Sequence, residues 1–223
     1  MSITGRTNLG PASAPFAEEY WRSFRVHAFT LIHRGAERLH ADNNLANAEE
    51  SDITGELTRA MEELSEASDA PEWIYSLSIH EEVPVHDPAK RGKRRNRFDI
   101  RIQGNNVRGP RPRYTFEAKR LSRNKADVSK YLGSEGLRMF LVGEYAREGL
   151  EAGMLGYMQS DDSFFWAEKI QKKLKTDAKQ LRVVEPWQSA PVLEALPSYT
   201  TRHQRKEPLA SILIFHLLLD FTG

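Results

Sequence analysis

The sequence predicts an α/β fold with a central mixed β-sheet flanked by helices and an N-terminal helical extension. Segments whose apolar residues recur every three or four positions alternate with short segments rich in aromatic and β-branched residues. The expected order after the first helix is helix, three strands, helix, strand, helix and strand, which is typical of a sheet with helices on its faces. A chain of 223 residues is long enough for one domain with a full core.

Two helices and a strand are expected before residue 80. Residues 16–41 have apolar side chains at helical spacing, and a polar break follows. A second helix is predicted over 50–68, where one face carries an apolar stripe of Ile53, Leu57, Met61 and Leu64. Beyond Pro71, the aromatic and β-branched stretch 73–79 predicts a strand.

The middle of the chain predicts two strands and a helical region. Segments 97–102 and 116–121 have strand character, and a connection rich in glycine, asparagine and proline joins them. A basic connector over 83–96 precedes this pair. Residues 126–149 return to helical spacing, with glycines that indicate a bend or two pieces.

The last third predicts a short apolar strand, a helix, a loop and a final strand. The strand is expected at 153–158, and a charged helix over 161–181. Residues 186–208 are predicted to be mostly loop. Residues 211–221 are apolar on both faces, which suits a buried strand or a subunit contact.

Composition indicates an ordinary globular protein that works in the cytoplasm. Hydrophobic residues make up 39% and charged residues 28%, and there is no cysteine for disulfides or thiolate zinc sites. Residues 1–15 lack an apolar core, so we expect neither a signal peptide nor a membrane span there. The longest apolar run, 212–219, is too short to cross a bilayer.

The net charge of +1 conceals a strong asymmetry along the chain. Residues 90–125 contain fourteen Lys and Arg against two acids, Asp99 and Glu117, a net charge of +12. The remainder has 18 basic and 29 acidic residues, a net charge of −11. Such a concentrated positive field attracts a polyanion, although a solvated loop or a face for an acidic protein partner has the same composition.

The two acids of the basic segment can meet a lysine on one sheet face. Side chains alternate across a strand, so Glu117 and Lys119 share a face, and in one hairpin register Asp99 lies opposite them. In the first strand, Phe98, Ile100 and Ile102 are then expected to point into the core. Two converging carboxylates suit Mg²⁺, with Mn²⁺ as a substitute. Lys119 is expected to orient or help deprotonate the attacking water and to offset the charge of the phosphorane. Ordinary salt bridges would give the same spacing.

These residues resemble the restriction-endonuclease-like, or PD-(D/E)xK, nuclease superfamily. Asp99 corresponds to the Asp of its motif, Glu117 to the acidic residue and Lys119 to the lysine, whereas Phe98 stands in place of the proline. The resemblance implies a core of helix, three-strand meander, helix and strand, matching residues 50–158, and divalent-metal-dependent hydrolysis of nucleic acid. It also implies the Ala118 carbonyl as a further metal ligand. Residues 131–157 are similar to segments of bacterial phage-defence nucleases.

Many members of the superfamily add a glutamate from the first core helix. Glu50, followed by apolar residues three and seven positions on, fits that pattern, with Glu56 as the alternative. Glu50 would then join the catalytic and metal-binding set. A plain N-terminal helix acid, favoured by the helix dipole, is the other interpretation of Glu50.

The function expected is a magnesium-dependent endo- or exonuclease, acting on DNA in preference to RNA, as a candidate effector of bacterial antiviral defence. Residues 1–48 would form a flexible segment and a helix packed on the core, and 49–223 the nuclease domain. A regulatory protein partner or homo-oligomer is expected to control it, with no membrane contact. The alternative is a catalytically inactive nucleic-acid-binding or protein-interaction subunit of the same fold. Phosphate contacts are expected from five arginines: Arg94, Arg95, Arg97, Arg101 and Arg120.

Overall fold

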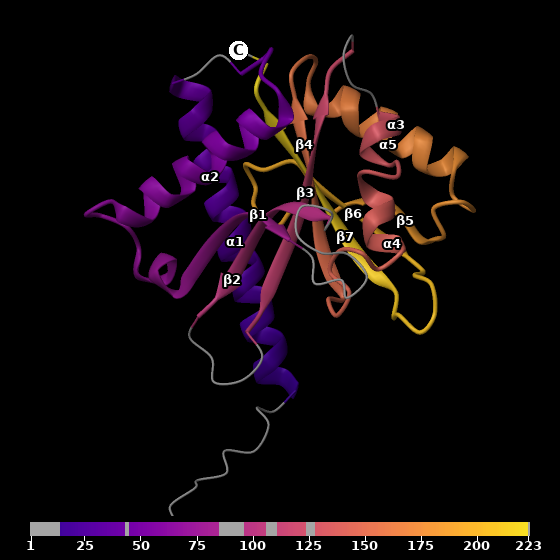
Figure 1. Cartoon of the computed structure of the whole chain (residues 1–223), viewed down its shortest axis with the longest axis horizontal. Coiled ribbons are helices and arrows are strands. Elements are labelled where there is room, and N and C mark those ends of the chain that lie inside the picture. Colours follow the sequence, from indigo (N-terminus) through magenta and orange to yellow (C-terminus); the bar gives the residue numbers. More distant parts are fainter. Residues whose placement is uncertain (1–13, 43–44, 85–95, 106–110, 124–127, 223) are drawn as a thin grey trace, which may run out of the picture.

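The computed structural model describes residues 14–42, 45–84, 96–105, 111–123 and 128–222. It is an α/β structure in which a seven-stranded sheet lies between two groups of helices (Figure 1). Helices α1 (Ala14–Asp42) and α2 (Glu50–Glu66) cover one face. The other face carries the short α3 (Val128–Tyr131), α4 (Leu137–Leu141) and the longer α5 (Ser163–Thr176). The expected α/β class, mixed sheet, flanking helices and N-terminal helix are therefore confirmed.

The sheet is mixed, with strand order β1-β2-β3-β4-β7-β6-β5. An antiparallel meander of β1 (Leu77–Pro84), β2 (Arg97–Gly104) and β3 (Arg113–Leu121) forms one side. The central strands β3, β4 (Glu151–Met158) and β7 (Ile212–Asp220) run parallel. The far edge consists of the antiparallel strands β6 and β5, Ser198–His203 and Val183–Ser189.

Several element predictions are confirmed and three are wrong. Most of the strand expected over 73–79 is a 3-10 helix, Glu72–Ser76, in which the Ile74 N–H donates to the Pro71 carbonyl. Strand β1 starts only at Leu77. The loop expected over 186–208 contains most of β5 and all of β6, because Pro186 in β5 and the polar composition of β6 are also typical of a loop. The charged helix ends at Thr176 instead of Leu181. The region 126–149 does contain two separate helical pieces.

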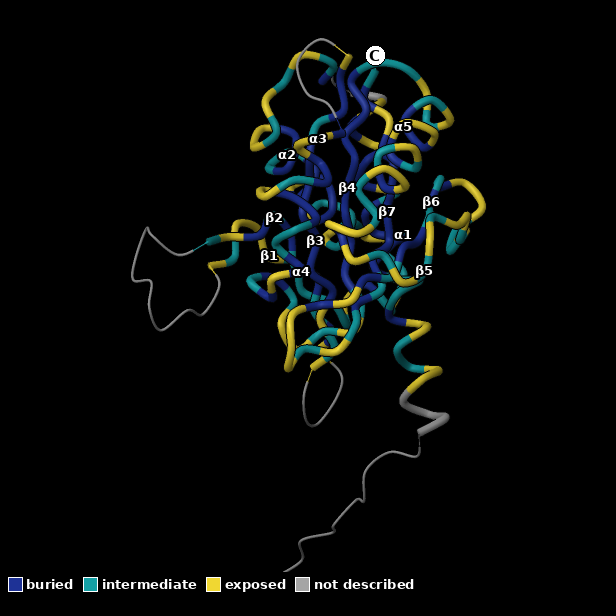
Figure 2. The backbone as a smooth tube through the Cα atoms, turned by 90° about the vertical axis from the view of Figure 1, so that its right-hand side faces the viewer, coloured by how far each residue is buried: buried dark blue, intermediate teal, exposed yellow. Residues whose placement is uncertain are grey.

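Two hydrophobic cores lie on opposite faces of the sheet. Figure 2 shows that the buried residues concentrate in the middle of the molecule. In the first core, Phe29 of α1 contacts the rings of Tyr114 and Phe116 from β3 and Phe215 from β7. Gly153 on β4 makes this possible, since a Cβ there would lie 2.2 Å from a ring carbon of Phe116. Helix α1 thus shares its core with α2 and the sheet.

The second core lies under α3, α4 and α5 and includes one residue expected elsewhere. Phe98 packs with Tyr145 in this core, whereas Ile100 and Ile102 belong to the first core. All three side chains are buried, as expected from the alternation of β2, but Phe98 contributes to a different core from Ile100 and Ile102. Within the described residues, no helix combines the length and the apolar character needed to cross a membrane.

A chain of buried polar side chains crosses the second half of the sheet. Nδ1 of His203 bonds the Leu181 carbonyl at 2.7 Å, so this nitrogen carries the proton and Nε2 accepts from the Thr201 hydroxyl at 2.7 Å. Thr201 in turn accepts from Nε2 of His216 at 2.8 Å, which leaves Nδ1 of His216 to accept from Tyr131 at 3.1 Å. Both imidazoles are therefore neutral. Burial lowers the pKa of His203 to about 4 and that of His216 well below its usual value.

Replacing His203 with asparagine is expected to reduce the acid sensitivity of folding. The ring has a pKa near 6.5 when unfolded and about 4 when folded, so its contribution to stability is complete above pH 6.5 and is lost as the pH falls. Between neutral pH and about pH 5, the wild type should lose about 2 kcal/mol of unfolding free energy relative to the variant. Urea unfolding at several pH values measures this difference. The same substitution at the exposed His80 is the control and should leave the pH dependence as in the wild type.

Candidate functional site

The candidate site lies where β2 leaves β3. The β2–β3 ladder ends at the pair Ile100 and Phe116, although β3 continues beside β4 to Leu121. Alternate N–H groups point to the same side of a strand, so those of Ala118 and Arg120 face the gap that β2 leaves. Carboxylates take both of these donors, and they come from different elements.

Asp99 accepts the first of these N–H groups. Its Oδ2 lies 2.6 Å from the Ala118 nitrogen, which fixes the carboxylate over the backbone of β3. Burial raises the pKa of Asp99, although Lys119 and the bond from Ala118 act in the opposite direction. As expected, Asp99 lies beside Glu117 and Lys119. It is held there by the hydrogen bond from the Ala118 N–H, because the backbone pairing of β2 with β3 ends at Ile100.

Glu50 accepts the second N–H group. One carboxylate oxygen, Oε2, lies 3.1 Å from the Arg120 nitrogen. Glu50 is the first residue of α2, where the positive end of the helix dipole favours a carboxylate. The alternative, Glu56, is engaged on the helix surface in an ion pair with Arg59 and has no contact with this site among the described interactions. The structure therefore brings Glu50 to the sequence motif.

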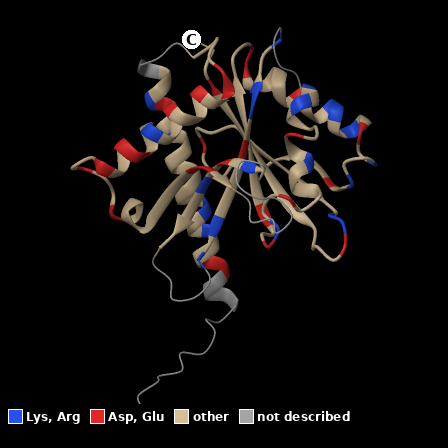
Figure 3. Ribbon diagram, viewed as in Figure 1, with Lys and Arg blue, Asp and Glu red and all other residues tan. Residues whose placement is uncertain are grey.

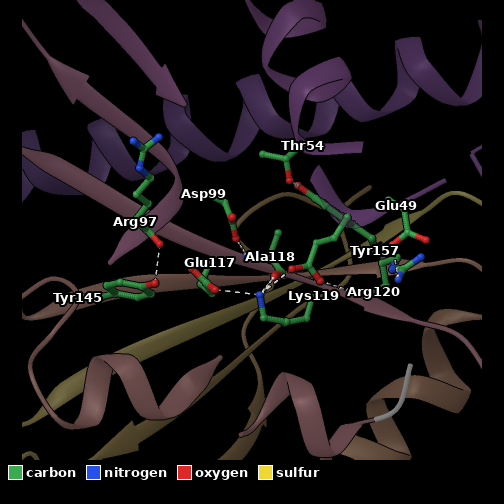
Figure 4. A network of polar contacts seen from close by, with 11 residues as sticks. Glu49, Thr54, Arg97, Asp99, Glu117, Ala118, Lys119, Arg120, Tyr145 and Tyr157 are labelled. Atoms are coloured by element: carbon green, nitrogen blue, oxygen red, sulfur yellow. Dashed lines mark hydrogen bonds and ion pairs between the residues drawn. The ribbon is translucent and has the colours of Figure 1, made fainter. Parts of the chain in front are cut away.

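Three oxygen atoms converge on the ammonium of Lys119. Nζ lies 2.7 Å from Oε1 of Glu50, 2.8 Å from Oε1 of Glu117 and 2.7 Å from the Ala118 carbonyl. Figure 4 shows Asp99, Glu117, Ala118 and Lys119 gathered at this point, with dashed lines meeting at the lysine nitrogen. Only 10% of the Lys119 side chain and 5% of the Glu117 side chain are exposed.

The Glu117 carboxyl is in an environment that strongly disfavours its ionised form. Burial raises its pKa to about 9, and repulsion from Asp99 adds to the shift. Among the described residues its second oxygen, Oε2, is buried and meets no N–H donor, although the Glu117 carboxyl interacts with Asp99 through a side-chain hydrogen bond. A buried acceptor without a donor is destabilising, so this oxygen is suited to a cation that supplies positive charge.

Lys119 keeps its proton in this setting. Burial alone disfavours an ammonium, but the attraction of Glu117, Glu50 and Asp99 outweighs burial and raises the pKa of Lys119. With three carboxylates around one ammonium, full ionisation would leave an excess of negative charge. The cluster is therefore short of positive charge.

Arg120 and Gln159 hold the start of α2 over the sheet. The Arg120 guanidinium donates to the Ala48 carbonyl at 3.1 Å and pairs with Glu49 at 2.7 Å. Gln159, which follows β4, donates to the same Ala48 carbonyl at 2.9 Å. Because these bonds anchor the residues just before Glu50, they set where its carboxylate lies.

The five arginines predicted to contact phosphate differ in what they contact in the structure. Arg94 and Arg95 lie outside the described residues. Arg97 pairs with Glu82 at 2.8 Å, and Arg101 lies over the Phe98 ring at 4.6 Å. The guanidinium of Arg120 is occupied by the anchoring contacts above.

Charge is unevenly distributed over the described surface (Figure 3). Seven of the fourteen basic residues in 90–125 lie outside the described residues, so the strongest part of the positive segment does too. Acidic side chains gather along α2 and basic ones along α5. The acidic helix α2 is the one that contributes Glu50 to the site.

Sequence reasoning missed two groups near the motif. Tyr145 donates to the Arg97 carbonyl at 2.5 Å, and burial together with the nearby Glu117 raises the pKa of its hydroxyl. Two residues beyond β3, Arg123 lies over the Phe165 ring, and Lys169 lies over the same ring, each at 4.5 Å. Only the sequence proximity of Arg123 to the motif could have suggested the second group.

The donor set suits a hard divalent cation in its chemistry. Glu50, Glu117 and the Ala118 carbonyl already converge, and Asp99 is adjacent; oxygen ligands of this kind are those that Mg²⁺ prefers. As the side chains lie, no group of three or more His, Asp or Glu in the described part of the chain could hold a metal ion. The ammonium of Lys119 takes the central position instead.

Comparison with known proteins gives no relative for this chain. No family model, no curated protein and no solved structure matches it. Its fold and site are therefore described from its own residues.

Proposed function

We propose that this chain is a divalent-metal-dependent nuclease with a restriction-endonuclease-like core. The observation that carries the proposal is the convergence of two carboxylates and a backbone carbonyl on Lys119, with Asp99 alongside. The element order supports it as well. Helix α2, the β1–β3 meander, the α3–α4 region and β4 follow the order that the sequence resemblance implies.

The residues of the cluster would have two roles, holding the metal ion and orienting the attacking water. Glu50, Asp99, Glu117 and the Ala118 carbonyl would hold Mg²⁺ or Mn²⁺. Such an ion polarises a phosphate, lowers the pKa of a coordinated water and offsets charge in the transition state. Because its pKa is raised, Lys119 acts as a hydrogen-bond donor that orients the attacking water and offsets phosphate charge, and not as a base.

The proposed substrate is DNA in preference to RNA. The likeness to phage-defence nucleases makes foreign DNA the first substrate to examine. The products expected from the resemblance are a 5′-phosphate and a 3′-hydroxyl.

The experiment incubates the chain with plasmid, linear double-stranded DNA, single-stranded DNA and RNA, with Mg²⁺, with Mn²⁺ or with a chelator. Metal-dependent cleavage of at least one substrate is expected. Salt-sensitive binding without cleavage of any substrate would contradict the proposal and favour a catalytically inactive nucleic-acid-binding subunit. Absence of both binding and cleavage at low salt would point to a protein-interaction module.

Substituting glutamine for Glu50 and, separately, for Glu56 tests which helix acid serves the site. The Glu50 variant loses a carboxylate 2.7 Å from Lys119, so its cleavage rate should fall at least about a hundredfold. The Glu56 variant loses only a surface ion pair, so its rate should stay within about threefold of the wild type. Initial rates under single-turnover conditions make the comparison. Equal losses in both variants would contradict the assignment of Glu50.

A further inference from the structure

The ammonium of Lys119 occupies the position that a cation shared by the site oxygens would take. Its three acceptors, from Glu50, Glu117 and Ala118, are also three of the four proposed metal ligands. The contacts of 2.7 to 2.8 Å leave no room for a second cation among the same atoms. Two positive charges at such a separation would also repel each other strongly in a buried site.

The cluster nevertheless retains unused capacity for positive charge. Within the described residues, Oε2 of the buried Glu117 meets no N–H donor. The Glu117 carboxyl interacts with that of Asp99 through a side-chain hydrogen bond, and Asp99 also accepts from the Ala118 N–H. One ammonium therefore satisfies the site only in part. A divalent ion would bring twice the charge to the same oxygens.

We propose that Lys119 is a built-in counter-cation that competes with the divalent metal for Glu50, Glu117 and the Ala118 carbonyl. Metal loading then requires the ammonium to leave these oxygens, which frees it to donate to an attacking water or to a phosphate oxygen. The lysine holds the carboxylates together before loading and is released into its working position by loading. This inference rests on the proposed metal site and adds a displacement step that regulates its occupancy.

Mn²⁺ binding to a Lys119→Met variant tests the competition directly. Methionine keeps a long side chain without the charge, so Mn²⁺ should bind at least about tenfold more tightly than to the wild type, although cleavage is lost. The matched control is Arg123→Met, which removes a nearby surface charge paired with Asp161 and should change the Mn²⁺ affinity less than about threefold. Electron paramagnetic resonance of free Mn²⁺ measures binding without any activity assay.

The nitrogen of Lys119 gives a second measurement on the wild-type chain, which holds even if the methionine variant does not fold. Its ¹⁵N resonance, assigned by its absence from Lys119→Arg, should show slow proton exchange without metal because three acceptors hold the ammonium. Saturation with Mg²⁺ should shift the resonance and speed its exchange. An unchanged resonance at saturating Mg²⁺, or equal or weaker Mn²⁺ binding by Lys119→Met, would overturn the inference.

The outcomes separate this inference from the proposed function. A wild type that cleaves DNA, combined with a Lys119→Met variant that binds Mn²⁺ no more tightly, overturns the competition alone. Tighter Mn²⁺ binding by the variant, combined with a wild type that cleaves nothing, supports the competition and overturns the nuclease. Failure of both chains to bind Mn²⁺ at millimolar concentration overturns both.

Discussion

Replacing Asp99 with asparagine is expected to lower metal-dependent cleavage at least about a thousandfold while leaving the fold intact. The amide oxygen of asparagine can still accept the Ala118 N–H, which Asp99 accepts at 2.6 Å, so the backbone anchor survives. The negative charge does not survive, and with it goes a ligand of the proposed metal site. Cleavage rates and thermal unfolding, measured on the same preparations, separate the two effects.

An exposed acid serves as the control for Asp99. Asp52 lies in the first turn of α2 and is exposed, so an asparagine there should leave the cleavage rate within about twofold of the wild type. Cleavage by the Asp99 variant at the wild-type rate would exclude this residue from the site. Loss of cleavage accompanied by loss of folding would instead make Asp99 a structural residue of the β2–β3 junction.

Replacing Glu117 with glutamine is expected to abolish cleavage and yet to stabilise the metal-free protein at alkaline pH. The Glu117 carboxyl has a pKa near 4.5 when unfolded and about 9 when folded. Above pH 4.5 the unfolded chain releases this proton while the folded chain retains it, so ionisation favours unfolding increasingly up to about pH 9. Glutamine cannot ionise, so this linkage should give the variant an advantage in unfolding free energy of about 4 to 5 kcal/mol at about pH 8.

The pH profile distinguishes this effect from a simple change in packing. Urea unfolding in the presence of a chelator should show the advantage of the Glu117→Gln variant growing from about pH 5 to about pH 8. The exposed Glu62 gives a matched glutamine substitution that should not change with pH in this way. A Glu117→Gln variant that is less stable than the wild type at pH 8 would show that the carboxylate is needed as a partner for Lys119.

Much of the site was predictable because strand alternation is a strong local rule. Residues 117 and 119 share a face of β3 whatever the rest of the fold does, so Glu117 and Lys119 could be placed together from sequence. The helical spacing of 50–57 likewise aligned Glu50 with the buried face of α2. These are relations within one element, which sequence patterns report well.

Contacts between different helices and strands could not be predicted from the sequence in the same way. The packing of Phe98 against Tyr145, in a different core from Ile100, occurs where the β2–β3 ladder has ended. The anchoring of α2 by Arg120 and Gln159 depends on contacts across some seventy and more than a hundred residues. No spacing along the chain indicates such contacts, because they arise only when separate elements pack together.

Strands β5 and β6 show a different limit. The edge strand β5 contains Pro186 and alternates between part-buried and exposed positions along most of its length, as suits a strand with one paired neighbour. Strand β6 is composed mostly of polar residues, although its positions are buried or part-buried. A pattern search tuned to apolar strands reads such a segment as a loop. In the fold, β6 pairs with a strand on each side, and its Thr201 and His203 are buried, which its polar sequence does not indicate.

The attachment of Asp99 and Glu50 to main-chain N–H groups has a consequence for divergence. Every amino acid except proline presents the same N–H at positions 118 and 120, so the anchors persist through substitutions that erase sequence similarity. A lineage can therefore change nearly all its side chains while it inherits the carboxylate positions from the backbone. The positions of these two carboxylates therefore depend on the backbone path of β3, and relatives with different side chains can be compared at the point where β2 separates from β3.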